Sequence, residues 1–312
     1  MFSDITYKTY KFFLSIIKKF FLEINFKHNL LRPGSKPFFS PDTFRGYADY
    51  VFENLPKPLN NINVNLNDVI YVDTNGNNLE HFFDYIHPNI QNKYILISHN
   101  SAKIIDEEIA KFQDSKIIHW FAENLTVPNN KEISILPIGL ESRYKLKNGT
   151  LHEIKKISKK SEIQKERIIL CSFATQTNKE VRQYVYDIAE VSNLCDINIY
   201  KNRKDYIESL SKYMFNLCPE GIGLDTHRFW ETLIAKTIPI VKNNNLIDNL
   251  SRYNIPMLVL DSWDDLENLS EKWLIEFYLK NKEILIKSDY TYFEFWKDKI
   301  ESKFVQNNVF NQ

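Results

Sequence analysis

The stretch FNLCPEGIGLDTHRFWETLIAKTIPIV, residues 215–241, decides how this chain folds. It opens with an apolar run that Pro219 ends, which predicts the carboxyl end of a buried strand. Gly221 and Gly223 follow, and a loop with these glycines is able to take positive φ and to approach a ligand closely. The first half of the stretch therefore predicts a strand that leads into a ligand-facing loop.

A helix and a second strand complete the stretch. Asp225 or Thr226 offers a side-chain oxygen to cap the start of the helix. Residues 238–241 are apolar and predict another buried strand. The apolar residues that give the helix one buried face recur at helical spacing and are Phe229, Leu233 and Ile234.

Two charged residues of this helix point to a binding function. Arg228 lies in the first turn of the helix, where the helix dipole is already positive. Together, the arginine and the helix N-terminus would bind an anion such as a diphosphate. Glu231 lies three residues further on the same face, and its carboxylate would accept the hydroxyls of a ribose. The alternative is a simple Arg228–Glu231 surface ion pair beside a loop whose glycines only turn the chain.

The stretch resembles the donor-binding segment of exostosin-like glycosyltransferases, C-P-x-G-x-G-x-x-x-x-R-x-W/Y-E-x-L-x-x-x-x-I-P-I/V. It is also similar to the broader GT-B pattern, in which one glutamate precedes a glycine loop and a second lies in the following helix. The resemblance implies that Glu220 faces the donor sugar and that Glu231 holds the ribose. One departure, Lys236-Thr237 where the family often has glycine, leaves the turn geometry open. The matching residues are Cys218, Pro219, Gly221, Gly223, Arg228, Trp230, Glu231, Leu233, Ile238, Pro239 and Ile240.

The composition restricts the class of protein. A chain of 312 residues with 43% hydrophobic residues has room for two domains with substantial cores. Its 40 basic and 40 acidic residues cancel, which argues against nucleic acid as a partner. Its 3 cysteines lie far apart in apolar runs and predict buried thiols in a reducing, cytoplasmic compartment.

The amino terminus, residues 7–26, alternates aromatic and aliphatic residues with lysines. Its longest apolar piece, residues 12–17, is too short to span a bilayer. One interpretation is a cationic amphipathic helix that contacts the inner face of a membrane peripherally. The other is a helix that packs its aromatic face on the rest of the fold.

From residue 68 the chain alternates strands and helices, which predicts a parallel, doubly wound sheet with ligands beyond the carboxyl ends of its strands. His99 and Glu123 follow two of these strands and are candidate general bases, although each is also typical of a structural residue. Asp42 and Arg45 are candidates for the acceptor side, with helix capping as the alternative for Asp42. The polar strand-end residues are Asp73, His99, Asn100, Glu123, Asn124 and Glu141.

The second half of the chain repeats the pattern. A strand over residues 168–173 leads to Thr175 and Arg182, and the resemblance to GT-B enzymes implies that these residues contact the donor phosphates. Another over residues 197–200 ends near Arg203, a candidate for a cationic diphosphate clamp. The helical carboxyl-terminal region contributes aromatic residues that we expect to pack in the core, namely Trp273, Phe277, Phe293 and Trp296.

Taken with the resemblance, these patterns predict an α/β, GT-B-like fold: two doubly wound Rossmann-like domains with a helical C-terminal extension. The predicted divisions are an acceptor-side domain (1–150) that includes an N-terminal helix, a lysine-rich linker (151–166), a donor-binding domain (167–269) and C-terminal helices that pack across both domains (270–312).

The resemblance implies a glycosyltransferase of surface polysaccharide synthesis that moves a sugar from a nucleotide-diphosphate sugar to a glycan hydroxyl, with inversion and with no metal or other cofactor. Glu220, Arg228, His99 and Glu123 are its candidate catalytic residues. Two alternatives stay open: a polyol-phosphate transferase on the same fold, and a non-catalytic glycan-binding or scaffold subunit. The candidate donor-binding residues are Gly221, Gly223, Thr226, Arg228, Glu231, Thr175, Arg182 and Arg203.

Overall fold

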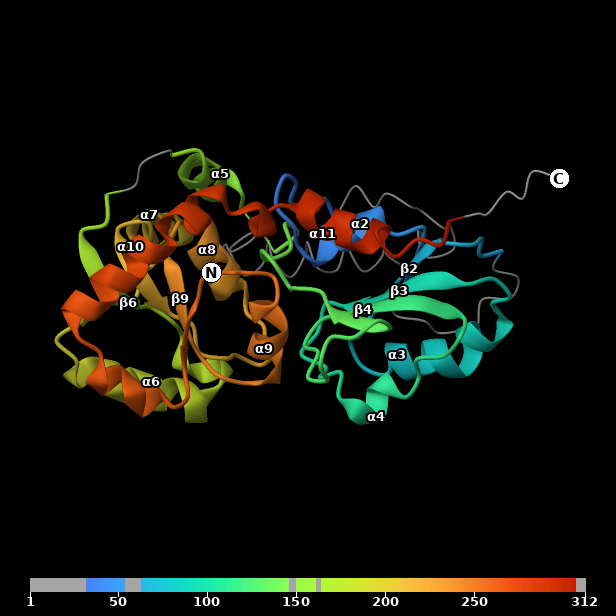
Figure 1. Cartoon of the computed structure of the whole chain (residues 1–312), viewed down its shortest axis with the longest axis horizontal. Coiled ribbons are helices and arrows are strands. Elements are labelled where there is room, and N and C mark those ends of the chain that lie inside the picture. The colour runs from blue at the N-terminus through green and yellow to red at the C-terminus, as the bar shows by residue number, and fades with distance from the viewer. Residues whose placement is uncertain (1–31, 54–62, 146–149, 161–163, 307–312) are drawn as a thin grey trace, which may run out of the picture.

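A computed structural model describes residues 32–53, 63–145, 150–160 and 164–306, and shows two α/β domains side by side (Figure 1). The first domain contains a sheet of 5 parallel strands in the sequential order β1-β2-β3-β4-β5. Every residue of β2 and β3 is buried, as expected of a parallel sheet covered on both faces. The strands are β1 (Tyr50–Phe52), β2 (Val69–Asp73), β3 (Tyr94–His99), β4 (Ile117–Ala122) and β5 (Ile133–Ile135).

Helices from different parts of the chain cover the two faces of this sheet. A sequential strand order with the usual right-handed crossovers places the connections on one face. There α3 (Asn78–His81), which continues as a π-helix over Phe82–Ile86, lies with α4 (Glu107–Ala110), and α2 (Pro41–Tyr47) lies with α11 (Phe293–Glu301) on the opposite face (Figure 1). The carboxyl terminus of the chain is therefore needed to complete the first domain.

The segment after residue 40 forms a short helix and then a strand. The helix α2 ends at Tyr47, and the chain then forms β1, which pairs with β2 from Tyr50 opposite Ile70 to Phe52 opposite Val72. The sequence pattern missed this strand because it has only 3 residues and its burial depends on the neighbouring strand.

The second domain contains another sheet of 5 parallel strands, in the order β10-β9-β8-β6-β7. The first strand of this domain, β6, lies between β7 and β8, so the direction of winding reverses between β6 and β8. Such a reversal opens a crevice at the carboxyl ends of the two strands. The strands are β6 (Arg167–Cys171), β7 (Cys195–Ile197), β8 (Tyr213–Leu217), β9 (Ile238–Lys242) and β10 (Leu258–Leu260).

The central stretch folds as predicted, into β8, a loop, α8 (His227–Ile234) and β9. Thr226 is the N-cap residue of α8, but its side chain makes no capping hydrogen bond. Just after α8, Lys236 takes the left-handed conformation with φ of +57°. The chain therefore makes this turn without the glycine that exostosin-like sequences often have there. The other helices of this domain are α6 (Lys179–Val191), α7 (Arg203–Leu210) and α9 (Asn245–Ser251), with a 3-10 turn over Thr175–Thr177 and a 3-10 helix over Trp263–Asn268.

The segment 151–166, predicted as a linker from its lysines, contains the helix α5 (His152–Ser158). Ile154 and Ile157 are buried in a cluster with Ile207 and Leu210 of α7. Residues 152–158 are therefore not a solvated linker. The two isoleucines, at helical spacing, pack on the second domain, while the charged residues lie on the other face of the helix.

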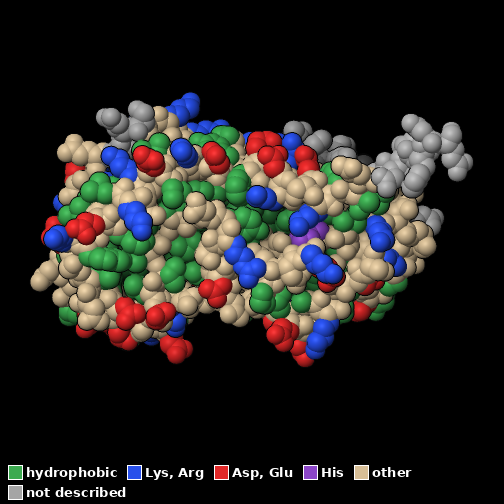
Figure 2. Space-filling view, in the orientation of Figure 1, with side chains coloured by type: hydrophobic (Ala, Val, Ile, Leu, Met, Phe, Trp, Pro, Cys, Tyr) green, Lys and Arg blue, Asp and Glu red, His purple; other side chains and the backbone are tan. Residues whose placement is uncertain are grey.

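The carboxyl-terminal helices are α10 (Glu271–Lys287) and α11, joined by a 3-10 turn over Asp289–Thr291. Phe293 and Trp296 are buried as predicted, and Phe277 is partly buried. Trp273 packs its ring 5.2 Å from that of Phe277, but it is 43% exposed and does not belong to the buried core. Figure 2 shows basic and acidic side chains interspersed over the visible face, with apolar side chains gathered over the second domain.

The fold prediction of two parallel α/β domains with a helical C-terminal extension is confirmed. The predicted amino-terminal helix at residues 7–26 lies outside the described residues. Within the described ranges, no helix is both long enough and apolar enough to cross a membrane.

A glycine between the two domains allows a test of this packing. Gly139 has φ of +68°, and a Cβ atom there would collide with the ring and carbonyl of Phe39. We expect Gly139→Ala to lower the free energy of unfolding by about 3 kcal/mol or more. Gly46→Ala is the control, because no atom lies within 4 Å of its added Cβ and alanine favours the helix α2. Urea denaturation would measure both, and equal stabilities would contradict the packing described.

Candidate functional site

The candidate site is a pocket of about 580 Å³ in the second domain. It opens at the carboxyl end of β6, beside the reversal of winding between β6 and β8. The starts of α7 and α8 contribute further side chains, so three parts of the chain far apart in sequence build one pocket. Its lining is Ser172, Phe173, Ala174, Thr175, Gln176, Gln183, Tyr186, Ile199, Tyr200, Lys201, Asn202, Arg203, Tyr206 and Arg228.

The charges of this pocket have one sign. Lys201, Arg203 and Arg228 line it, and its lining within the described part of the chain includes no aspartate or glutamate. Cations that share a partly enclosed space without a carboxylate repel one another and attract an anion. The pocket therefore favours a negatively charged ligand.

Arg228 is held by groups of the second domain. Its Nη1 donates hydrogen bonds to the backbone oxygen of Ser172 and, over 3.1 Å, to the hydroxyl of Tyr206. Its guanidinium carbon lies 5.4 Å from the centre of the Tyr206 ring and 5.8 Å from that of Phe173. These contacts place the Arg228 charge at the junction of β6, α7 and α8.

Arg203, and not Arg228, is the partner of Glu231. Its Nη1 lies 2.6 Å from Oε1 of Glu231, and the two side chains are 10% and 7% exposed. The alternative of an Arg228–Glu231 surface pair is thus wrong, because the fold brings Arg203 from α7 to the Glu231 carboxylate.

Two donors in this region lack a partner. Among the residues that the structure describes, the Nε atoms of Arg203 and Arg228 are buried and neither donates a hydrogen bond. A buried donor left unpaired costs about 1–3 kcal/mol, more when the group is charged. Both atoms are closed to solvent, so a ligand in the pocket would meet the other nitrogens of these guanidinium groups.

Sequence reasoning missed Tyr206, the residue that supports Arg228. Tyr206 lies three positions after Arg203 and on the same helix face, so the spacing was a usable signal. The helix α7 begins at Arg203 and extends to Leu210, so Arg203 and Tyr206 lie together at the pocket.

Arg182, predicted to contact phosphates, instead holds loops together. Its guanidinium donates to the backbone oxygens of Ala174, Pro219 and Glu220, at 3.0, 3.3 and 3.0 Å. Burial, and then the neighbouring charge of Arg228, lower the pKa of Arg182 to about 10. Because backbone carbonyls occupy its donors, Arg182 fixes the loop after β6 to the loop after β8.

The glycine loop lies beside a smaller hollow of about 10 Å³, which Glu220 and Thr226 line and which has room for about one water molecule. Neither Gly221 nor Gly223 takes positive φ, so that part of the prediction is wrong. An added Cβ at Gly223 would lie 3.2 Å from Oδ1 of Asn124 in the first domain, a tight contact that the Asn124 side chain would have to relieve by a small shift.

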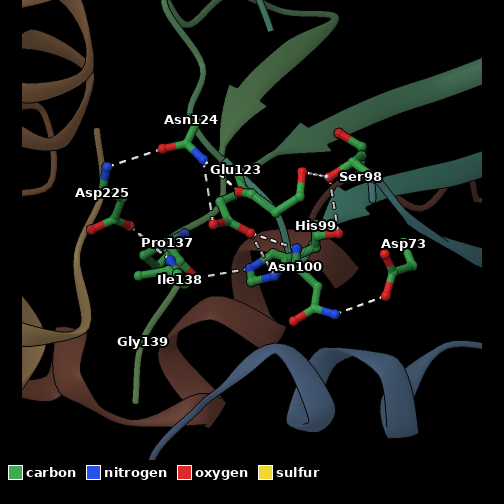
Figure 3. A network of polar contacts seen from close by, with 12 residues as sticks. Asp73, Ser98, His99, Asn100, Glu123, Asn124, Pro137, Ile138, Gly139 and Asp225 are labelled. Carbon is green, nitrogen blue, oxygen red and sulfur yellow. Dashed lines mark hydrogen bonds and ion pairs between the residues drawn. The ribbon is translucent and has the colours of Figure 1, made fainter. Parts of the chain in front are cut away.

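The loop is bound to the first domain through Asp225 (Figure 3). The backbone N–H of Asp225 donates to Oδ1 of Asn124 over 3.0 Å, and its Oδ2 accepts from the backbone N–H of Ile138 over 2.7 Å. Its Oδ1 also accepts from Nε1 of Trp230 over 2.9 Å. Burial raises the pKa of Asp225 to about 6. Asp225 therefore connects the domains and does not cap α8.

The predicted polar residues at the ends of β2, β3 and β4 do come together, but they form a buried network (Figure 3). Oδ2 of Asp73 accepts from Nδ2 of Asn100 over 2.7 Å, and Oε2 of Glu123 accepts from the backbone N–H of Asn100 over 2.6 Å. Nδ2 of Asn124 donates to the backbone oxygen of Ser101 over 2.9 Å. These bonds hold the strand ends where Asp225 meets them.

His99 and Glu123 lie inside this network and not in the pocket. His99 is 0% and Glu123 is 2% exposed. Nε2 of His99 faces the backbone oxygen of Pro137 at 3.0 Å and so carries hydrogen, while Nδ1 lies 3.0 Å from Oε2 of Glu123. Burial lowers the pKa of His99 to about 3 and raises that of Glu123 well above its usual value. Both shifts favour the uncharged form, and both side chains are buried, which corrects the prediction that either is an accessible base.

Asp42 and Arg45, the predicted acceptor-side residues, lie in a buried ion-pair cluster. Nε of Arg32 lies 2.7 Å from Oδ1 of Asp42, and Nη2 of Arg45 lies 2.7 Å from Oε1 of Glu53. The two candidates are 1% and 6% exposed. The charge of Asp42 is thus paired with Arg32 and that of Arg45 with Glu53, and these pairs fix α2 within the first domain.

His227 forms a second bridge between the domains. Its Nδ1 lies 2.7 Å from the backbone oxygen of Gly139, and its Nε2 lies 3.3 Å from Oε1 of Glu141. Both ring nitrogens face acceptors, so the imidazolium form satisfies both contacts. Burial lowers the pKa of His227, but the hydrogen bond and charge of Glu141 outweigh it and raise the pKa overall.

No family model matches this chain, and no curated protein matches it. Among solved structures it is similar to the apo structure of OtsA, with 11% identity over 77% of this chain and 73% of that chain and a TM-score of 0.45. It is similar to WaaG, a glycosyltransferase involved in lipopolysaccharide biosynthesis, with 10% identity over 75% of this chain and 90% of that chain and a TM-score of 0.37. It is also similar to the pneumococcal O-GlcNAc transferase GtfA in complex with UDP and GlcNAc, with 11% identity over 77% of this chain and 58% of that chain and a TM-score of 0.37. At these identities the similarity concerns the fold alone.

The His227 bridge predicts a pH-dependent stability. Because the folded pKa lies above the unfolded value of 6.5, the contribution is fully present below about pH 6.5 and is lost as the pH rises through the folded pKa. Glu141, whose pKa the bridge holds at about 2, stays ionised throughout. We expect His227→Gln to be less stable than wild type by roughly 1 kcal/mol at low pH and equally stable at high pH. Urea denaturation from about pH 5 to about pH 9 would measure this, and parallel profiles would contradict it.

Proposed function

We propose that this chain is a glycosyltransferase that binds a nucleotide-diphosphate sugar in the pocket of the second domain. The observation that carries the proposal is the cationic lining of the pocket at the reversal of the sheet, with Lys201, Arg203 and Arg228 and, within the described residues, no aspartate or glutamate. A diphosphate would supply the negative charge that the described lining of the pocket lacks, and acceptor oxygens for its guanidinium groups.

The size and lining of the pocket support a nucleotide as the rest of the ligand. Its volume of about 580 Å³ lies within the usual range for small-molecule sites. Tyr186 and Tyr200 line it and offer aromatic faces to a base. Thr175 lines it as predicted and adds a hydroxyl.

In the proposed reaction, the bond between the anomeric carbon and the diphosphate oxygen breaks while an acceptor hydroxyl oxygen bonds to that carbon. The nucleoside diphosphate leaves with the bonding electrons, and Arg228 and Arg203 stabilise the charge that develops on it. The acceptor proton passes to a base from the first-domain side. Glu220 would face the donor sugar from the glycine loop, as the exostosin-like resemblance implies.

The resemblance supports the finer parts of the proposal. They are inversion at the anomeric carbon, no resident metal or other cofactor, a glycan acceptor, and a place in surface polysaccharide synthesis in the cytoplasm, with peripheral membrane contact through residues 7–26 as an addition.

Binding measurements with a matched arginine variant test this proposal. We expect one of UDP, GDP, CMP or CDP to bind wild type, and Arg228→Ala to weaken it by about a hundredfold, since a charged hydrogen-bonding partner is lost. Arg167→Ala is the control, because Arg167 begins β6, pairs with Asp196 at 2.6 Å and is 54% exposed outside the pocket. Isothermal calorimetry would give the dissociation constants.

The outcomes separate the alternatives. Specific binding of CDP would point to a polyol-phosphate transferase on the same architecture. Absence of nucleotide binding at millimolar concentration, or equal losses in the two arginine variants, would contradict the proposed function and favour a scaffold or glycan-binding subunit.

A further inference from the structure

The helix residue Glu231 is placed behind the pocket and not in its wall. Its side chain is 7% exposed, and it is absent from the pocket's lining within the described part of the chain. Its Oε1 accepts a hydrogen bond from Nη1 of Arg203 over 2.6 Å. One of the two carboxylate oxygens is therefore bonded to an arginine.

The same contact orients Arg203. The side chain leaves the first residue of α7, lines the pocket, and has Nη1 held at Glu231 while its buried Nε finds no partner in the described part of the chain. A guanidinium is a rigid plane with donors on more than one edge, so a carboxylate that fixes one edge sets the direction of the others. Holding Arg203 in advance also removes the entropy cost of ordering its long side chain when a ligand arrives.

Glu231 has an electrostatic effect on the pocket as well. Arg203 and Arg228 line the same pocket, and their charges repel in the absence of an anion. A buried carboxylate next to Arg203 offsets that repulsion and keeps the guanidinium in place. Removing it would leave a buried, uncompensated charge.

We propose that Glu231 is a positioning residue that orients Arg203 toward the diphosphate, and that it does not bind the ribose. This inference rests on the proposed function, because it assigns the partner through which Glu231 acts at that site. It replaces the role that the family resemblance implied for Glu231.

The test compares three probes: UDP, its 2′-deoxy counterpart and inorganic pyrophosphate, with calorimetry on the full chain. We expect Glu231→Gln to weaken pyrophosphate and both nucleotides by the same factor, about tenfold. The preference for UDP over the deoxy form stays unchanged. The double variant Arg203→Gln/Glu231→Gln binds no more weakly than Arg203→Gln alone, because the two residues act as one unit.

Two further variants keep the test decisive. Glu208→Gln is the control, since Glu208 lies on the same helix as Arg203, is 42% exposed and is not part of the pocket's lining. If Glu231→Gln does not fold, Glu231→Asp retains the charge with a shorter reach and is expected to weaken pyrophosphate while leaving the ribose preference intact.

The contrary results are distinct. If Glu231→Gln, or Glu231→Asp in its place, binds pyrophosphate as wild type does but loses the preference for UDP over the deoxy form, Glu231 is a ribose ligand and the inference is overturned. Additive losses in the double variant overturn it too. If wild type binds neither pyrophosphate nor any nucleotide, the proposed function itself fails.

Discussion

The buried carboxylate of Asp225 is the constraint on which the arrangement of the domains and the site depends. It accepts N–H groups from Ile138 in the first domain and from Trp230 in α8, while its own backbone N–H donates to Asn124. Charge buried in this way is stable only when such bonds are complete. They fix the loop before α8 against the first domain, and α8 in turn carries Arg228 to the pocket.

The pocket then follows from topology and charge. The reversal between β6 and β8 leaves space at the strand ends. Tyr206, Arg182 and Glu231 hold the surrounding loops and guanidinium groups in place. The cationic groups are thereby ordered before any ligand binds, which is the condition under which electrostatic stabilisation of a leaving group is most effective. The contacts that stabilise these loops are therefore also the contacts that order the proposed site.

Local patterns in the sequence predicted much of the fold and part of the candidate site. The apolar runs and glycines of residues 215–241 were sufficient for β8, α8 and β9, because their burial follows from sequence period alone. Thr175, Arg203 and Arg228 line one pocket, since the carboxyl ends of parallel strands meet at one edge. The burial of His99 and Glu123 and the Arg203–Glu231 pair were not predictable, because they depend on contacts between elements far apart in the chain.

The most direct test of the central claim is a crystal structure of the chain with the nucleoside diphosphate that binds it. The account predicts electron density for the diphosphate between the guanidinium groups of Arg203 and Arg228, with Arg203 still hydrogen-bonded to Glu231. Density for the nucleotide at another place on the molecule would contradict it. A pocket without density, in crystals grown with a nucleotide that binds in solution, would contradict it too.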